Sequence, residues 1–260
     1  MLKGAMLFRA WSGELHRPTR DVDLLGHGDP SPAHLAGVFA QILREVSDAE
    51  DGLVFDAENV TADETREGQE YGGVRLRIPA ALGNARVVVQ VDVGFGDAIT
   101  PDATEREFPT LLGHTAPRVR AYPPETVIAE KLEAICSLGM ANSRMKDFYD
   151  VIVISRRFKF VGDVLARAIE ATFERRGTMV PQELPAGLSD RFGEDGHKQG
   201  QWAAFRGRLR IEDAPEGLAE AVRLVREFLL FPLQAAASGA AFKSNWTPRD
   251  GWQPSGDALN

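Results

Sequence analysis

The sequence offers little that belongs to an oxidising compartment or a membrane. It has one cysteine among 260 residues, Cys136, so it cannot form an internal disulfide, and this favours a reducing compartment. Its unbroken apolar runs, such as Val151–Ile154, are far shorter than the roughly 20 residues that a membrane-spanning helix needs. The first residues are not followed by the long apolar stretch of a signal peptide. We therefore expect a cytoplasmic protein with neither a membrane partner nor a disulfide partner.

Several widespread chemical signatures are absent as well. The five histidines have no metal-ligand spacing such as His-x-x-x-His and no cysteine partner, which argues against a zinc site. The glycines at positions 94 and 96 are not followed by the Gly-Lys-Ser/Thr of a phosphate loop, and there is no Gly-x-Ser-x-Gly elbow. Cys136 lies in an apolar helical pattern and is expected to be inert packing.

The charge is unevenly distributed along the chain. There are 38 acidic and 30 basic residues, which gives a net charge of -8. Residues 45–70 carry ten acids and one base, whereas residues 142–177 carry eight bases and five acids. A local basic face can hold a phosphate backbone whatever the total charge, so the acidic total does not exclude nucleic acid.

The hydrophobic pattern predicts an α+β protein with two lobes. A helical period covers residues 33–46, and extended segments are predicted at 52–55, 74–78 and 86–95, the last two joined by a turn at 83–84. Further helices are expected at 125–138, 144–158, 161–176, 200–210 and 216–230. We expect a mixed α/β lobe over residues 1–120, a helical lobe over 121–238 with a surface loop at 181–200, and a loose tail over 239–260.

Two aspartates at alternate positions form the first candidate site. In an extended segment, Asp21 and Asp23 point to the same side, while Val22 and Leu24 face a core. Two carboxylates on one face repel, and a cation between them relieves the repulsion. Mg²⁺ suits such a pair because it takes one or two carboxylates and keeps positions open for phosphate oxygens. The alternative is a solvated acidic turn.

A third aspartate, Asp92, interrupts a run of valines at 87–93. On an inner strand it would be a buried charge, which is normally paired or bound to a metal, and on an edge strand it would simply face water. If its strand lies beside the one that carries Asp21 and Asp23, three carboxylates converge. Such a triplet is far more specific than any pair.

Two further charged residues violate the apolar stripes of predicted helices. Lys131 lies three residues after Ile128 and four before Ile135, so its ammonium must either extend to solvent or meet an anion. Asp147 lies near the start of the next helix, on its buried side. A simple role at the helix N-terminus would also explain this aspartate, because an acid there is stabilised by the helix dipole.

Five short segments, in this order, resemble the AbiEii/AbiGii-type nucleotidyltransferase toxins of type IV toxin–antitoxin and phage abortive-infection systems. They are Leu2-Lys3-Gly4-Ala5, Arg17-Pro18-Thr19-Arg20-Asp21-Val22-Asp23-Leu24, Val91-Asp92, Ala129-Glu130-Lys131 and Arg144-Met145-Lys146-Asp147-Phe148-Tyr149-Asp150. The resemblance runs from about residue 2 to residue 160. No single segment would be specific, but the ordered set is.

The resemblance implies a DNA polymerase β-like nucleotidyltransferase lobe joined to a helical lobe. It implies NTP as substrate, Mg²⁺ as cofactor, an antitoxin encoded nearby and, as in some members, transfer of a nucleotide to the 3′ end of tRNA. Carried over by motif, Asp21 and Asp23 hold the metal. Asp92 resembles the third carboxylate of the fold, a further metal ligand placed to take a proton from the attacking hydroxyl. Asp147, with Asp150 as the alternative, is the further acid of the helical lobe.

The nucleotide-binding residues also follow from the resemblance and the chemistry of a triphosphate. Lys131 would neutralise charge on the phosphates, helped by Arg20 or Arg144. Thr19 would lie beside the triphosphate. The backbone N–H groups at Gly4 and Ala5 would contact phosphate. The basic stretch from residue 144 to residue 176 is the expected face for an RNA acceptor.

The sequence departs from the family pattern in two ways. Ala5 stands where the fold usually has Gly or Ser after the first glycine, so a serine hydroxyl is missing. Family members usually carry sequence ahead of the Leu-Lys-Gly-Ala segment, which suggests a late start codon or a truncated chain. Two other functions stay open: transfer to a small molecule, and an NTP-binding scaffold without turnover.

Overall fold

A computed structural model describes residues 1–14, 16–46, 52–65, 72–111, 113–209, 211 and 213–255. The chain divides into two compact units. The first comprises Met1–Asp97 and Thr104–Ala121, and the second comprises Ala98–Ala103 and Tyr122–Asn260. Within the described ranges, every helix falls short of the length and apolar character needed to cross a membrane.

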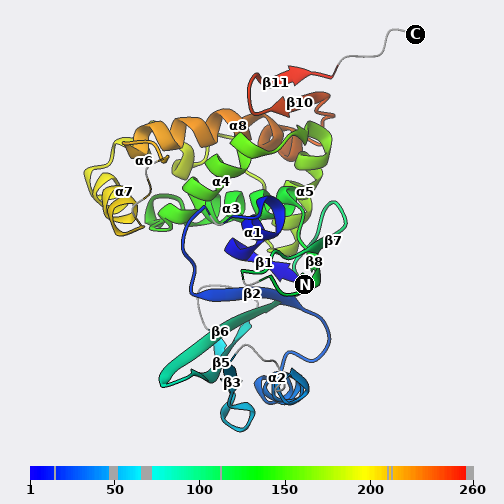
Figure 1. Cartoon of the computed structure of the whole chain (residues 1–260). Coiled ribbons are helices and arrows are strands. Elements are labelled where there is room, and N and C mark those ends of the chain that lie inside the picture. The colour runs from blue at the N-terminus through cyan, green and yellow to red at the C-terminus, as the bar shows by residue number, and fades with distance from the viewer. Residues whose placement is uncertain are drawn as a thin grey trace. The chain divides into compact units, whose positions relative to one another are not determined.

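The first unit is built on a mixed sheet (Figure 1). Its elements are β1 (Leu2–Lys3), η1 (Gly4–Met6), α1 (Leu7–Ser12), β2 (Asp21–Gly26), α2 (Pro32–Val46), β3 (Leu53–Phe55), η2 (Ala57–Asn59), β4 (Thr61–Thr65), β5 (Gly73–Leu82), β6 (Ala85–Phe95), β7 (Thr104–Glu107) and β8 (Arg118–Ala121). The strand order is β3-β5-β6-β2-β1-β8-β7, with β4 also pairing with β5. Strand β2 is parallel to β6 and β1 is parallel to β8, whereas the other pairs are antiparallel.

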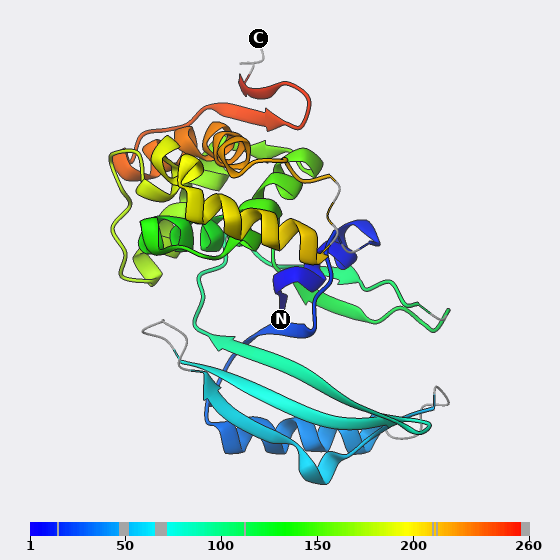
Figure 2. The same cartoon turned by 90° about the vertical axis from the view of Figure 1, so that its left-hand side faces the viewer.

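Helix α2 covers one face of this sheet (Figure 2). The alternation along β5 buries Val74, Leu76 and Ile78, which pack with Val91 and Val93 of β6 and with Leu35 and Leu43 of α2. Because successive residues of a strand point to opposite faces, Arg75 and Arg77 lie on the face away from α2. The predicted hairpin is confirmed: Leu82 pairs with Ala85 across a turn in which Gly83 has φ +58°, a conformation that suits glycine.

The second unit is mostly helical (Figure 1). Its elements are α3 (Pro124–Leu138), η3 (Gly139–Ala141), α4 (Met145–Arg157), β9 (Phe160–Val161), α5 (Gly162–Arg175), η4 (Ala186–Leu188), α6 (Asp190–Glu194), α7 (Gly196–Leu209), α8 (Leu218–Ser238), β10 (Ser244–Thr247) and β11 (Gly251–Pro254). Helix α5 packs on α3 and α8, burying apolar residues spaced three and four apart. With the mixed sheet of the first unit, these helices give the expected α+β class.

The surface loop predicted over residues 181–200 is wrong for most of its length. This stretch contains η4, α6 and the start of α7, and both Leu188 and Phe192 are completely buried. Ser189 caps α6 by accepting a hydrogen bond from the Phe192 N–H, and the Phe192 ring stacks on Phe148. The prolines and glycines of this stretch favoured a loop, and α6 is only about one turn long, which is too short for a helical period to be recognised in the sequence.

The loose tail predicted from residue 239 is also wrong, except that residues 256–260 lie outside the described residues. Strands β10 and β11 form an antiparallel hairpin, and β10 also pairs with β9. Trp246 is buried, donates from Nε1 to the Ser155 carbonyl at 2.7 Å, and packs with its ring centroid 4.7 Å from that of Phe228. Strands of four residues are too short to show an alternating pattern in the sequence. The hairpin is instead held to the helices by Trp246.

We expect Trp246→Ala to destabilise the second unit by about 3–5 kcal/mol, as for other large buried aromatic residues. The substitution removes the ring contacts and leaves the Ser155 carbonyl without its indole donor. Thermal unfolding of the full chain measures this effect. Substitution of the exposed Lys243, just before the hairpin, is the control and should change the melting temperature little. An unchanged melting temperature for Trp246→Ala would mean that the hairpin does not stabilise the unit.

Candidate functional site

Three aspartates of neighbouring strands in the first unit come together on one face of the sheet. Asp21 and Asp23 lie on β2, and Asp92 lies on β6, where the parallel register places it beside Asp23. One carboxylate oxygen from each residue lies within 4.8 Å of the others. The sequence predicted that the three carboxylates converge if the strand of Asp92 lies beside that of Asp21 and Asp23, and β2 and β6 are indeed neighbours. These residues, the carboxylate trio, supply hard oxygen ligands of the kind that Mg²⁺ or Mn²⁺ prefers.

Core packing and a hydrogen bond hold the two trio aspartates of β2 in place. Val22 and Leu24, which alternate with the aspartates, pack against the core beneath α2. The Thr19 hydroxyl donates a hydrogen bond to Asp21 Oδ1 at 2.6 Å, so this threonine orients a trio carboxylate directly. Arg20, the residue before β2, is exposed. The trio residues themselves are only half-buried, which leaves them accessible to an ion.

Gly4 makes room for the Asp23 carboxylate. It has φ +71°, and a β-carbon at this position would overlap Asp23 Oδ2. Ala5, the next residue, is buried. Sequence reasoning assigned Gly4 to phosphate contact, and the structure adds a steric reason for glycine: the backbone turns tightly against a trio carboxylate.

We therefore expect Gly4→Ala to weaken divalent-ion binding at the trio and to destabilise the first unit by about 1–3 kcal/mol through backbone strain. Gly13→Ala is a matched control, because Gly13 has φ +81° but a methyl group added there would have nothing within 4 Å. Titration with Mn²⁺ and thermal unfolding measure both effects. Equal Mn²⁺ affinity for the two variants would contradict the steric role of Gly4.

Basic side chains lie on the same face as the trio. Arg75 of β5 is directly opposite Asp92 and holds both of its oxygens, with Nε–Oδ1 at 2.8 Å and Nη2–Oδ2 at 2.9 Å. Lys3 of β1 is opposite Asp23 and pairs with Asp97. Sequence reasoning missed Arg75, although the signal was present: the turn at 83–84 fixes the hairpin register, and counting back along both strands pairs residue 75 with residue 92.

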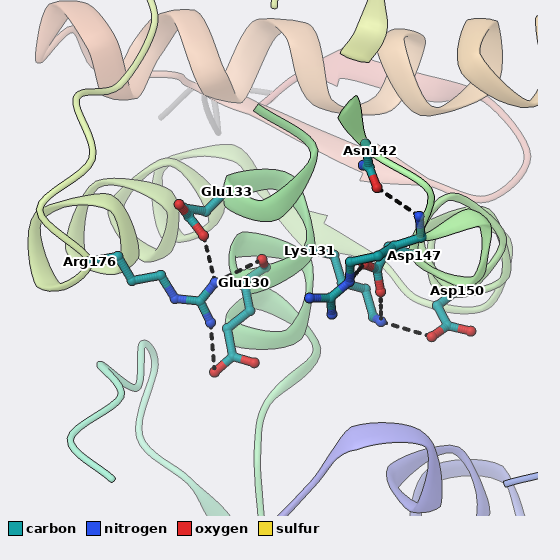
Figure 3. Close-up of polar contacts among 8 residues, drawn as sticks. Glu130, Lys131, Glu133, Asn142, Asp147, Asp150 and Arg176 are labelled. Atoms are coloured by element: carbon teal, nitrogen blue, oxygen red, sulfur yellow. Dashed lines mark hydrogen bonds and ion pairs between the residues drawn. The ribbon is translucent and has the colours of Figure 1, made fainter. Parts of the chain in front are cut away.

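In the second unit, Lys131 of α3 meets two buried carboxylates of α4 (Figure 3). Its Nζ lies 2.9 Å from Asp147 Oδ1 and 2.8 Å from Asp150 Oδ2. Both aspartates are almost completely buried, at 0% and 1% side-chain exposure, and Arg144 adds an ion pair to Asp147 at 2.7 Å. The Lys131 ammonium therefore meets anions rather than extending to solvent. One ion-pair cluster explains why both Lys131 and Asp147 lie on apolar helix stripes.

A second set of contacts fixes the start of α4. Asn142 is fully buried, and its side-chain oxygen accepts a hydrogen bond from the Arg144 N–H at 2.8 Å. The buried Lys198 of α7 donates to the Asn142 carbonyl at 2.8 Å. Asp147 lies in the first turn of α4, as expected for an acid at a helix N-terminus. No sequence pattern pointed to Lys198, because α7 lies far from α4 along the chain.

Arg176 does not belong to an exposed basic face, contrary to the expectation for residues 144–176. Its side chain is only 15% exposed and pairs with Glu133 at 2.6 Å (Figure 3). Thr178 donates to the other Glu133 oxygen at 2.9 Å. Glu133 is itself buried on α3. Six bases of this stretch are exposed: Arg144, Lys146, Arg156, Arg157, Lys159 and Arg167.

Cys136 is unsuited to nucleophilic chemistry. Burial, reinforced by the negative charge of Glu133, raises the pKa of its thiol to about 12. The thiol therefore stays protonated at neutral pH, and the thiolate is the nucleophilic form. This agrees with its expected role as packing within α3.

Comparison with known proteins gives a family match and two similar solved structures. The family model described as nucleotidyl transferase AbiEii toxin, type IV TA system, matches residues 1–225. Among solved structures, a candidate nucleotidyltransferase from Helicobacter pylori is 14% identical, with a TM-score of 0.46, over 92% of this chain and 86% of its own. JHP933 from the same organism is 13% identical, with a TM-score of 0.48, over 92% and 84%. A search of curated proteins gave no match.

Proposed function

The chain belongs to the AbiEii nucleotidyltransferase toxin family of type IV toxin–antitoxin systems, and on that premise we propose that it transfers a nucleotide from an NTP to an RNA end with a divalent metal at the carboxylate trio. The family itself implies a nucleotidyltransferase that uses NTP and has an antitoxin partner. The metal, the residue roles and the acceptor are the proposal. The observation that carries it is the convergence of Asp21, Asp23 and Asp92 from two adjacent strands.

The trio fits Mg²⁺ in the chemistry of its donors. Its members are carboxylates, they are half-buried rather than sealed, and their ligand atoms are close enough to share one ion. We assign Asp21, Asp23 and Asp92 to hold it. When bound, the ion would stabilise negative charge on the attacking and leaving oxygens of an in-line transfer. Thr19 would keep the Asp21 carboxylate in the orientation that its hydrogen bond sets.

The nucleotide would be held by backbone and by positive charge. The N–H groups of Gly4 and Ala5, with Thr19 nearby, are assigned to the phosphates. Lys131 is assigned to neutralise phosphate charge, with Arg20 and Arg144 as further cations. The proton of the attacking hydroxyl would go to Asp92, because Asp147 and Asp150, the alternatives in the second unit, are almost completely buried and paired with Lys131.

The acceptor we propose is the 3′ end of tRNA. The supporting features are the family and the six exposed bases between residues 144 and 167. Exposed basic side chains can hold a phosphate backbone through charge alone, so binding should weaken steeply as salt rises.

The acceptor is tested by offering labelled NTP with total tRNA, with tRNA whose 3′ ribose has been oxidised by periodate, and with an aminoglycoside. Label should enter intact tRNA only, because oxidation destroys the hydroxyl that attacks the nucleotide. Label on the aminoglycoside would support transfer to a small molecule. NTP binding without any labelled product would support a scaffold without turnover.

A further inference from the structure

Asp92 is a trio member whose two oxygens are already engaged by a cation of the same sheet. The Arg75 guanidinium donates to both of them, at 2.8 Å and 2.9 Å, and Gln90 Nε2 lies 3.5 Å from Oδ2. A carboxylate has about four lone-pair sites, and the bidentate bond occupies one on each oxygen. One Asp92 oxygen also lies within 4.8 Å of the ligand atoms of Asp21 and Asp23. Arg75 thus restricts how Asp92 can meet an ion.

The pairing of β5 with β6 places Arg75 beside Asp92, so the contact does not depend on the side-chain conformation of the arginine alone. It lies in β5, directly opposite Asp92, in a register that the hairpin turn fixes. Its side chain is 29% exposed and that of Asp92 is 22% exposed, so the pair is partly withdrawn from solvent screening. A planar guanidinium matches a carboxylate with two parallel bonds, which an ammonium cannot do.

The charges at the site explain why such a partner is needed. Three carboxylates within 4.8 Å of one another repel strongly in the absence of a counter-charge. A guanidinium on one of them offsets part of this repulsion before any divalent ion arrives. The same positive charge must also repel that ion, because both lie beside the same carboxylates.

We propose that Arg75 is a positioning residue of this site: it fixes the Asp92 carboxylate by its bidentate bond and, by its charge, lowers the affinity of the trio for a free divalent ion. This inference rests on the proposed function for the role of the ion. In the NTP-free protein, the ion is then held chiefly by Asp21 and Asp23. The negative triphosphate offsets the charge of Arg75, so tight ion binding accompanies the nucleotide.

Two substitutions separate the charge of Arg75 from its geometry. Arg75→Gln removes the charge, and we expect Mn²⁺ to bind the NTP-free protein about tenfold more tightly. Arg75→Lys keeps the charge but not the two parallel bonds, so Mn²⁺ affinity should stay within about twofold of the wild type. Both variants should lose about tenfold or more in kcat at saturating NTP, because Asp92 is no longer held in one orientation.

Arg77→Gln is the matched control. Arg77 lies two residues further along β5 on the same face, but it pairs with Asp63 at 2.6 Å rather than with a trio member. It should leave both Mn²⁺ affinity and kcat unchanged. The measurement is titration of the full NTP-free chain with Mn²⁺, followed by electron paramagnetic resonance of the free ion, with kcat and KM measured in parallel.

Each result decides a different claim. If neither the wild type nor Arg75→Gln binds Mn²⁺, the metal centre of the proposed function is wrong. If the wild type binds Mn²⁺ and Arg75→Gln binds it equally or more weakly, the inference about Arg75 is wrong and the proposed function stands. Should Arg75→Gln fail to fold, Arg75→Lys still decides, since a wild-type kcat for that variant would overturn the positioning role.

Discussion

Lys131→Ala is expected to destabilise the protein by about 3–5 kcal/mol, whatever it does to activity. The Lys131 ammonium bonds to Asp147 and Asp150, whose side chains are 0% and 1% exposed. Without this ammonium, Asp150 loses its ion pair with Lys131. Asp147 then keeps only the ion pair with the more exposed Arg144 among the pairs described above. Chemical denaturation of the full chain, followed by circular dichroism, measures the loss.

The control is Arg144→Ala, which removes the outer partner of the same Asp147. The Arg144 side chain is 46% exposed, so solvent screens its ion pair and the expected loss is about 1 kcal/mol or less. A Lys131→Ala variant as stable as the wild type would contradict the structural importance of this cluster. It follows that lost activity in Lys131→Ala cannot by itself prove a contact with phosphate, and that Lys131→Arg, which keeps the charge, is the better variant for that question.

Asp21→Asn is expected to reduce nucleotidyl transfer by about a thousandfold or more while leaving stability nearly unchanged. The side chain keeps its shape and can still accept the Thr19 hydrogen bond, but it loses the negative charge that would hold the ion. Removing one of three repelling charges should not weaken the fold. Label incorporation and thermal unfolding of the same preparation measure the two quantities.

Asp63→Asn is the matched control for this loss. Asp63 lies on β4, pairs with Arg77 and is 64% exposed, so it is an aspartate of the same sheet without a place in the trio. Its substitution should keep wild-type transfer. Substantial activity in Asp21→Asn would contradict the assignment of Asp21 to the metal.

The parts of the fold with strong local periods could be predicted from the sequence. The β5–β6 hairpin and helices α2, α3, α4 and α5 were expected close to their observed positions, because alternation and helical spacing reflect which side of each element is buried. Helix α8 was expected to end at residue 230 but continues to Ser238. The short elements were not predicted. Strand β10 and helix α6 are anchored by single aromatic residues, Trp246 and Phe192, and one turn or four residues are too few to show a period.

The candidate site shows the same division. Asp21 and Asp23 could be paired from a two-residue spacing alone, whereas their meeting with Asp92 depended on strand order, which the sequence left open as a condition. Arg75 was missed because an arginine on the polar face of a strand is ordinary until its partner strand is known. Lys131 and Asp147 were recognised as anomalies, but that they bond to each other, and that Lys131 also bonds to Asp150, required the helices to be placed.

The central claim is tested most directly by comparing two labels on the same NTP. Purified protein is incubated with total tRNA and Mg²⁺, with each NTP carrying radioactive phosphorus at either the α or the γ position, and a parallel set contains a chelator. Nucleotidyl transfer predicts label in tRNA from an α-labelled NTP, none from the γ-labelled form, and none with the chelator. Label from the γ position, or α-label that persists without a divalent ion, would contradict metal-dependent nucleotidyl transfer.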